Sequence, residues 1–130
     1  MTGMTTDTST LTAVVDTYID MWNEEDADRR ADLIRRAWAD DARYRDPLLE
    51  ADGPAGLSEM VAAVHGQYPG HRFRRTSGID AHHDVARFGW ELVAPDGAVF
   101  VAGVDVATLA DDGRLRTIVG FFGDPPAREG

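Results

Sequence analysis

The sequence predicts a single α+β domain in which three N-terminal helices pack on one face of a curved, mainly antiparallel sheet. In the first half of the chain, apolar residues recur at the spacing of amphipathic helices. From His71 onward, extended apolar segments alternate with short turns, which is typical of an antiparallel meander. A chain of 130 residues has room for one hydrophobic core. We therefore expect one cone-shaped domain over residues 10–124, with a flexible N-terminal tail at 1–9 and a C-terminal tail at 125–130.

Two helices are expected before the first strand. The first follows Thr8-Ser9-Thr10, a stretch able to cap a helix, and its apolar face comprises Leu11, Val14, Val15, Tyr18 and Trp22. The apolar face of the second comprises Ala27, Ala31, Ile34 and Trp38. The opposite face of the second helix carries Arg29, Arg30, Asp32, Arg35 and Arg36, and we interpret it as a solvated face.

A short strand and a third helix follow. Residues 42–46 alternate, so Ala42, Tyr44 and Asp46 share one side and Arg43 and Arg45 share the other. If the arginines face water, Asp46 faces inward. Pro47 and Asp52-Gly53-Pro54 bracket a second extended piece, and Pro54 suits the first turn of a helix. That helix is expected to bury Leu57, Met60, Val61, Val64 and Tyr68, and to end at Pro69-Gly70.

The second half predicts four strands, over residues 71–79, 85–93, 98–109 and 115–122. Turns are expected at His83-Asp84, at residues 95–97 and at residues 111–113. In the third of these strands, one face carries Val99, Val101, Gly103, Asp105 and Ala107, and the other carries Phe100, Ala102, Val104 and Val106. Both faces therefore look buried. Because a single sheet layer leaves one face without a partner, we predict a homodimer packed through the outer face.

Composition and charge exclude several classes of function. The formal net charge of −10 disfavours nucleic acid and anionic membranes as partners. Residues 1–10 lack the pattern of a signal peptide and no later segment is long enough to span a bilayer, so a cytoplasmic location is expected. Cysteine and lysine are absent, and none of the three serines lies in a G-x-S-x-G motif. Covalent catalysis is therefore disfavoured, whereas acid and base chemistry by Asp, Tyr or His stays open.

Three polar residues occupy positions where the pattern predicts an apolar side chain. Tyr18 lies in the apolar face of the first helix, Asp46 on the inward side of a strand, and Asp105 within a strand rich in valine. An unpaired carboxylate in an apolar interior costs several kcal/mol, so it usually persists only when it is paired, protonated or useful. These residues are our candidates for a site that moves a proton.

The same residues carry a resemblance to a known family. The stretch Thr12 to Tyr18, Trp38-Ala39-Asp40-Asp41-Ala42 running to Asp46-Pro47, and Gly103-Val104-Asp105 with Gly113-Arg114 resemble the steroid Δ-isomerases. More broadly, the chain resembles the SnoaL-like group of the nuclear transport factor 2-like superfamily, over nearly its whole length after the N-terminal tail. The resemblance implies a nuclear transport factor 2-like cone, a fold that hosts isomerases, polyketide cyclases, epoxide hydrolases and non-catalytic modules.

The resemblance also implies residue roles. It implies that Asp46 is a general base removing a proton α to a carbonyl, and that Tyr18 and a protonated Asp105 hold the enolate oxygen; ketosteroid isomerase is itself the standard example of such a protonated acid. The implied ligand is a small apolar carbonyl compound, with no cofactor and no metal. We expect the apolar lining of the pocket to include Trp22, Tyr44, Met60, Val64, Trp90 and Val101.

Several alternatives stay open. Tyr18 could be a core tyrosine bonded to a backbone carbonyl, Asp46 could only start a turn, and Asp105 could pair with an arginine or a tryptophan indole. His82-His83 is interpreted as a turn rather than a metal site, and His65 is given no role. The alternative functions are a non-catalytic ligand-binding or dimerisation module and an epoxide hydrolase. The hydrolase needs an arginine in the pocket, for which Arg72, Arg74 and Arg87 are poor candidates.

Overall fold

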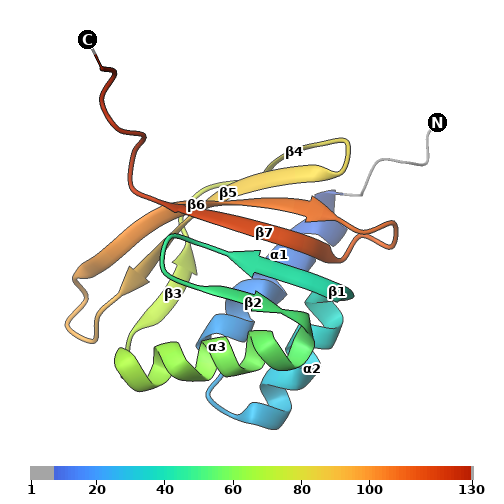
Figure 1. The fold of residues 1–130 in the computed structure, drawn as a ribbon, viewed down its shortest axis with the longest axis horizontal. Helices are drawn as coiled ribbons and strands as arrows, with labels where there is room; N and C mark the ends of the chain where they lie inside the picture. Colours follow the sequence, from blue (N-terminus) through green and yellow to red (C-terminus); the bar gives the residue numbers. More distant parts are fainter. Residues whose placement is uncertain (1–7, 130) are drawn as a thin grey trace.

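Three helices pack against one face of a strongly curved sheet in the computed structural model, which describes residues 8–129 (Figure 1). The helices are α1 (Thr8–Asn23), α2 (Ala27–Ala37) and α3 (Gly53–Gln67). The strands are β1 (Trp38–Arg45), β2 (Glu50–Asp52), β3 (Arg72–Arg75), β4 (Asp80–His82), β5 (Val85–Val93), β6 (Val99–Leu109) and β7 (Leu115–Phe122). The predicted α+β class is confirmed, with the helices on one face of an unclosed sheet.

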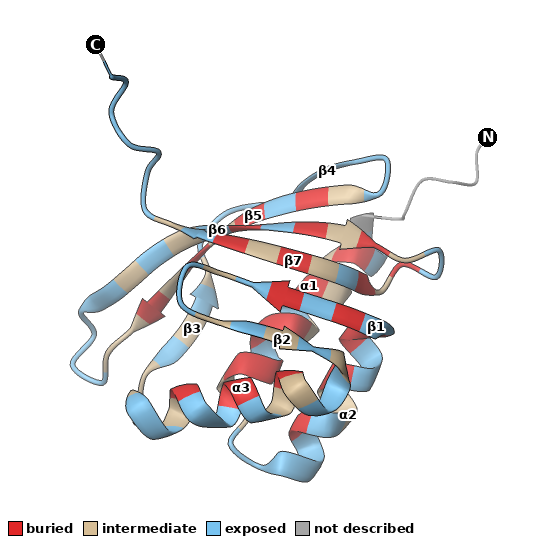
Figure 2. Ribbon diagram, in the orientation of Figure 1, coloured by how far each residue is buried: buried red, intermediate tan, exposed pale blue. Residues whose placement is uncertain are grey.

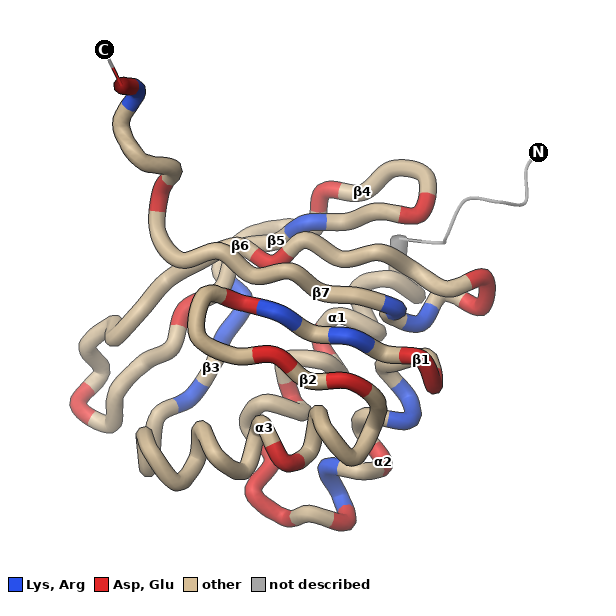
Figure 3. Tube along the Cα trace, viewed as in Figure 1, with Lys and Arg blue, Asp and Glu red and all other residues tan. Residues whose placement is uncertain are grey.

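The sheet is mixed. Its strand order is β2-β1-β7-β6-β5-β3, and β4 pairs with β5 beside this path. Every pairing is antiparallel except that of β1 with β7. Buried residues gather where the helices face the concave side of the sheet, and exposed residues follow the outer faces of the helices (Figure 2). Basic residues on β1 lie beside acidic residues on β2 (Figure 3), and Arg43 pairs with Asp52 at 3.3 Å.

The described residues include part of each expected tail. Residues 1–7 and Gly130 lie outside the described residues. Thr8, Ser9 and Thr10 belong to α1 itself rather than preceding it as a cap, so the helix begins within the expected tail at 1–9. Residues 125–129 form no helix or strand, and no described helix is long and apolar enough to cross a membrane.

The boundary between α2 and β1 was predicted wrongly. The side chain of Asp26 accepts a hydrogen bond from the Arg29 backbone N–H and starts α2. Trp38, which we expected on the second helix, takes extended backbone angles and opens β1. Its side chain is still fully buried, because the strand turns it into the same core that the helical face contacts. The helix therefore ends at Ala37, and β1 begins four residues before the expected strand.

Arg30 is also a correction, because it was assigned to a solvated helix face. Only 4% of its surface is exposed. Its Nε donates to Ser58 Oγ at 3.0 Å, and its Nη1 donates to the Glu24 backbone oxygen at 2.7 Å. These bonds tie α2 to α3 and to the link that follows α1. The other arginines of this face, Arg29, Arg35 and Arg36, are exposed as expected.

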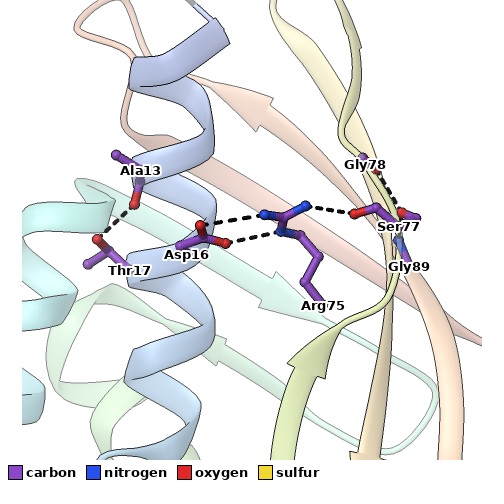
Figure 4. Close-up of polar contacts among 7 residues, drawn as sticks. All are labelled: Ala13, Asp16, Thr17, Arg75, Ser77, Gly78 and Gly89. Carbon is purple, nitrogen blue, oxygen red and sulfur yellow. Dashed lines mark hydrogen bonds and ion pairs between the residues drawn. The ribbon is translucent and has the colours of Figure 1, made fainter.

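The single strand expected over residues 71–79 is shorter in the structure: only Arg72–Arg75 form a strand, β3, and β4 lies beyond the expected range at Asp80–His82. Arg75 turns toward α1, where its Nε donates to Asp16 Oδ1 at 3.0 Å, and its Nη1 donates to the Ser77 backbone oxygen at 2.7 Å (Figure 4). Ser77 Oγ accepts a bond from the Gly89 N–H, so a side chain replaces the backbone partner of β5 at this point. These bonds hold the connection in a bend that interrupts the ladder.

A bulge near the start of β6 changes which residues face inward. Leu92 pairs with Val101 and Val93 with Val99, so Phe100 is the extra residue. Phe100, predicted on the outer face, instead packs at a tilt against Tyr68, with 5.0 Å between ring centroids, and 54% of its surface stays exposed. Farther along β6 the predicted alternation holds, and Asp105 and Ala107 are buried. The expected parity is therefore correct only beyond the bulge.

The outer face of the sheet is not covered within one chain. Val104 and Val106 are each 37% exposed, and Phe121 of the neighbouring strand is 57% exposed. The sequence pattern predicts that both faces of β6 are buried, and in the single chain only the concave face is. The predicted homodimer through this face stays a prediction.

Candidate active site

An apolar cavity of about 220 Å³ lies between the helices and the concave face of the sheet. Its walls come from α1, from the end of β1 and the loop after it, from the end of α3, and from β3, β5, β6 and β7. Tyr18, Asp46 and Asp105 all line it. Three residues that are far apart in the sequence therefore reach one space.

Tyr18 and Asp105 form a buried pair. The Tyr18 hydroxyl donates to Asp105 Oδ2 at 2.8 Å, and both residues are almost fully buried. The Tyr18 ring is fixed by edge contacts with Trp38 and Phe88, at 5.7 and 6.1 Å between ring centroids. The phenol is thus bound to a carboxyl rather than to a backbone carbonyl, which was the alternative considered for it.

Asp105 has a second donor, the Trp90 indole. Trp90 Nε1 donates to Asp105 Oδ1 at 3.0 Å from the neighbouring strand. Trp90 pairs with Gly103, and a Cβ at Gly103 would lie 2.6 Å from the Trp90 ring. The absence of a side chain at Gly103 is what lets the indole lie flat across β6 and reach the acid. The expected alternative of an indole partner for Asp105 is therefore observed.

Asp46 lies just beyond the end of β1 and starts a turn. Its Oδ1 accepts bonds from the backbone N–H groups of Leu48 and Leu49, each at 2.8 Å. Such side-chain-to-backbone bonds are common where aspartate begins a turn. The same residue is half-buried and lines the cavity, so the turn is what holds the carboxyl at the cavity wall.

Tyr44 supplies a hydroxyl that the sequence analysis assigned only to the apolar lining. It donates to Asp46 Oδ2 at 2.6 Å. The signal that could have revealed this bond is the spacing, because residues two apart on a strand project to the same side. Trp90 was likewise predicted as apolar lining and contributes a polar group.

The protonation states follow from these surroundings. Burial raises the pKa of Asp105 to about 7, against the opposing effect of the bonds from Tyr18 and Trp90. The charge of the nearby Asp46 contributes a smaller part of this rise in pKa. Burial is also the main cause that raises the pKa of Tyr18 well above its ordinary value, followed by the charge of Asp105. Tyr18 therefore stays a hydrogen-bond donor throughout the physiological range.

Most of the expected lining residues are found at the cavity. Trp22, Tyr44, Val64, Trp90 and Val101 line it. Met60 is a correction: it is buried in the core and does not line the cavity. One helical turn separates it from Val64, and only the C-terminal end of α3 reaches the cavity. The lining residues that the sequence analysis did not name are Ile19, Leu48, Leu49, Tyr68, Phe73, Leu92, Phe100 and Phe122.

The cavity wall holds two acids and no basic side chain among the described residues. His65 Nε2 lies 2.7 Å from the Trp22 backbone oxygen, outside the lining. Residues 8–129 contain no cluster of three or more His, Cys, Asp or Glu side chains that could hold a metal ion. The polar chemistry available to a ligand in this cavity is that of carboxyl, phenol and indole groups.

Gly120 is the point where the two acids approach one another. It pairs with Asp105 across β6 and β7, and a Cβ on it would lie 2.8 Å from Asp105 Oδ1 and 3.3 Å from Asp46 Cβ. Replacing Gly120 with alanine should displace the Asp105 carboxyl and weaken its bond to Trp90. We expect a loss of about 1–3 kcal/mol in the free energy of unfolding, measured by urea denaturation.

The matched control is Gly66→Ala. Gly66 is exposed on α3, and a Cβ there would meet nothing within 4 Å. Alanine favours a helix over glycine by about 1 kcal/mol, so this variant should be as stable as the wild type or more stable. Equal stability of Gly120→Ala and Gly66→Ala would show that the spot between the acids is not tightly packed.

Comparison with known proteins finds a matching family profile and similar solved structures. The sequence profile described as SnoaL-like domain matches residues 15–118. A crystal structure of a proposed isomerase of the SnoaL-like family from Agrobacterium tumefaciens is 38% identical, with a TM-score of 0.84, covering 89% of this chain and 99% of that chain. No curated protein matches this chain.

Two more distant structures share the fold. A proposed SnoaL-like polyketide cyclase from Jannaschia is 19% identical with a TM-score of 0.63, and 85% of each chain is covered. A nuclear transport factor 2-like protein of unknown function from Exiguobacterium is 22% identical with a TM-score of 0.65, covering 86% of this chain and 99% of that chain. At these identities the likeness shows the architecture alone, and it confirms the cone expected from the sequence.

Proposed function

The chain belongs to the SnoaL-like family, and from this premise we propose that it catalyses proton transfer α to a carbonyl group in a small neutral molecule. The reaction is of the isomerase or polyketide-cyclase type and uses Asp46 as the base. The observation that carries this proposal is the pair of carboxyls in one apolar cavity with different surroundings. Asp46 meets three donors at a half-exposed turn, whereas Asp105 is buried and has its pKa raised to about 7.

The first step uses Asp46. An ionised carboxylate only accepts hydrogen bonds, and the three donors around Asp46 match that form. Asp46 Oδ2 takes the proton from the carbon next to the carbonyl. The C–H electron pair forms the C=C bond of an enolate, and the carbonyl π electrons move to oxygen. Asp46 then returns the proton to another carbon of the same system, so no external reagent is consumed.

Tyr18 holds the enolate oxygen, with Asp105 acting behind it. When Asp105 is protonated, the 2.8 Å contact between these residues can run in the reverse direction, with the Asp105 hydroxyl donating to the Tyr18 oxygen. The Tyr18 proton is then free to point into the cavity. A donor aimed at developing negative charge in a dry site is worth about 3–4 kcal/mol. Asp105 thus serves through the phenol, whereas the family resemblance implied a direct second donor.

The ligand class follows from the wall of the cavity. Because no arginine or histidine lines it within residues 8–129, and because the chain carries a net charge of −10, an anionic substrate would meet only repulsion. The lining is otherwise aromatic and aliphatic, which favours a cyclic apolar ketone. The epoxide hydrolase alternative gains no support, since Arg74 and Arg87 pair with Glu91 and Asp80 at the surface.

The dependence of the rate on pH tests whether the reaction requires a protonated Asp105. Since Asp105 must be protonated, kcat/KM should fall as the pH rises through about 7, where this group loses its proton. In Asp105→Asn the side-chain amide keeps a donor at every pH, so this alkaline limb should vanish. The measurement is the isomerisation or exchange rate of a cyclic β,γ-unsaturated ketone between pH 5 and 9. An alkaline limb that persists unchanged in Asp105→Asn would remove Asp105 from the reaction.

A non-catalytic binding module remains the alternative function. It would bind the same ketones in the cavity and release them with no exchange of protons. The experiment that separates the two functions is deuterium incorporation from solvent, since binding alone leaves the α-hydrogen in place.

A further inference from the structure

We propose that Tyr44 is the positioning residue of Asp46: it fixes the orientation of this carboxylate and leaves one acceptor position open to the cavity. The bond from the Tyr44 hydroxyl to Asp46 Oδ2, at 2.6 Å, is the observation that carries this inference. The catalytic consequence rests on the proposed function, whereas the hydrogen bond and its effect on Asp46 do not.

The hydroxyl is held by a rigid ring. Tyr44 is 3% exposed and lies on β1 between Ala51 of β2 and Ile118 of β7. Trp22 packs against the ring edge at 5.5 Å between centroids. The backbone of Tyr44 is therefore paired on both sides, and its buried ring packs against an indole. This packing restrains the hydroxyl that binds the carboxylate.

The carboxylate is restrained at both oxygens. Two backbone N–H groups bind Oδ1, and Tyr44 binds Oδ2. A carboxylate offers about four acceptor positions, so three donors leave one of them. A turn alone would leave Asp46 free to rotate about the bond to its carboxyl group. The Tyr44 bond stops that rotation and presents a single oxygen to a substrate.

Tyr44 is suited to remain a donor. Burial raises its pKa far above the ordinary value, and the charges of Asp105 and Asp46 raise it further. The phenol therefore does not compete with Asp46 as a base. It donates to Asp46 Oδ2 and fixes the position of that oxygen.

The test variant is Tyr44→Phe, which removes one oxygen and keeps the ring. Because Asp46 is only half-buried, water can replace the lost donor, and the variant is expected to fold. The matched control is Tyr68→Phe, since Tyr68 also lines the cavity and its hydroxyl has no hydrogen bond described within residues 8–129. Carbon-13 NMR of labelled aspartate side chains compares the Asp46 carboxyl signal at constant pH in the wild type and both variants.

Removing this hydrogen bond should change the chemical shift of the Asp46 carboxyl carbon in Tyr44→Phe, measured at constant pH. No such change is expected in Tyr68→Phe. A carboxyl shift that is the same in the wild type and Tyr44→Phe would overturn the inference. If Tyr44→Phe fails to fold, the wild-type Tyr44 hydroxyl proton provides the second readout: it should resonate downfield and shift in Asp46→Asn, and an unshifted resonance would overturn the inference.

Kinetics separate this inference from the proposed function. In Tyr44→Phe kcat should fall several-fold more than KM changes, because a loosened base is misplaced. A changed Asp46 carboxyl signal without ketone exchange in the wild type would defeat the proposed function and leave the Tyr44–Asp46 pairing standing. Exchange with an unchanged kcat in Tyr44→Phe would defeat the positioning role alone.

Discussion

Replacing Asp46 with asparagine is expected to lower kcat for a ketone substrate by on the order of 10²- to 10⁴-fold, which is the usual contribution of a general base. Asparagine retains an oxygen that can accept the Leu48 and Leu49 N–H bonds, so the turn should persist. What it lacks is a group that can take up a proton. Steady-state kinetics with a cyclic ketone provide the measurement, and circular dichroism establishes that the variant is folded.

The control for this substitution is Asp40→Asn. Asp40 is exposed on the same strand as Tyr44 and lies outside the cavity lining. Its replacement changes the net charge by the same amount and should leave the rate within about twofold of the wild type, as expected for an isolated surface charge. Equal rates for Asp46→Asn and the wild type would remove Asp46 from the reaction.

The second large effect is on stability, through Asp105. Its pKa is about 7 in the folded protein, and about 3.9 is expected for aspartate in an unfolded chain. Between these values the folded state keeps a proton that the unfolded state has released. The contribution of Asp105 to stability is therefore fully present below pH 4 and declines as the pH rises to about 7. A difference of about three pH units corresponds to a loss of about 4 kcal/mol.

Asp105→Asn isolates this contribution, because it removes the titrating group and leaves the others in place. The free energy of unfolding is measured by urea denaturation from pH 4 to pH 8.5 for both proteins. The wild type should lose stability relative to Asp105→Asn by up to about 4 kcal/mol across the window, with a plateau above pH 7. If the difference in free energy of unfolding between the two proteins does not vary with pH, Asp105 has an ordinary pKa that burial does not raise.

Patterns that depend on one element could be predicted from the sequence. The apolar spacing of α1 and α3, the first-turn proline of α3 and the inward side of β1 are all local properties. They placed Tyr18 in the core and Asp46 at the cavity wall. Asp105 was placed correctly because the alternation of β6 is regular beyond its bulge. These three positions needed only the period of a helix or a strand.

Features that depend on two elements could not be predicted in the same way. The bulge that turns Phe100 inward follows from the register between β5 and β6, and the bend after β3 follows from bonds that Arg75 and Ser77 make to other segments. Arg30 is buried because Ser58 on α3 and the Glu24 carbonyl accept its donors. The residues near Arg30 in the sequence do not indicate those partners.

The hydrogen-bond donors of the site were equally hard to predict from the sequence. Tyr44 and Trp90 look apolar in a pattern of hydrophobic residues, and their polar atoms matter only because each reaches a carboxyl. For Tyr44, the two-residue spacing to Asp46 could have indicated the hydrogen bond. For Trp90 the indication in the sequence was weaker, since it required knowing that Gly103 lies opposite in the neighbouring strand.

Solvent deuterium exchange addresses the proposed chemistry itself. The wild-type protein is incubated in D₂O with a panel of neutral one- to four-ring ketones, and proton NMR follows both the α-hydrogen of the ketone and the indole signal of Trp90. We expect at least one ketone that perturbs the Trp90 signal to lose its α-hydrogen much faster than in buffer, and Asp46→Asn to bind that ketone without exchange. Ketones that bind beside Trp90 and keep their α-hydrogens at the buffer rate would contradict proton transfer by this cavity.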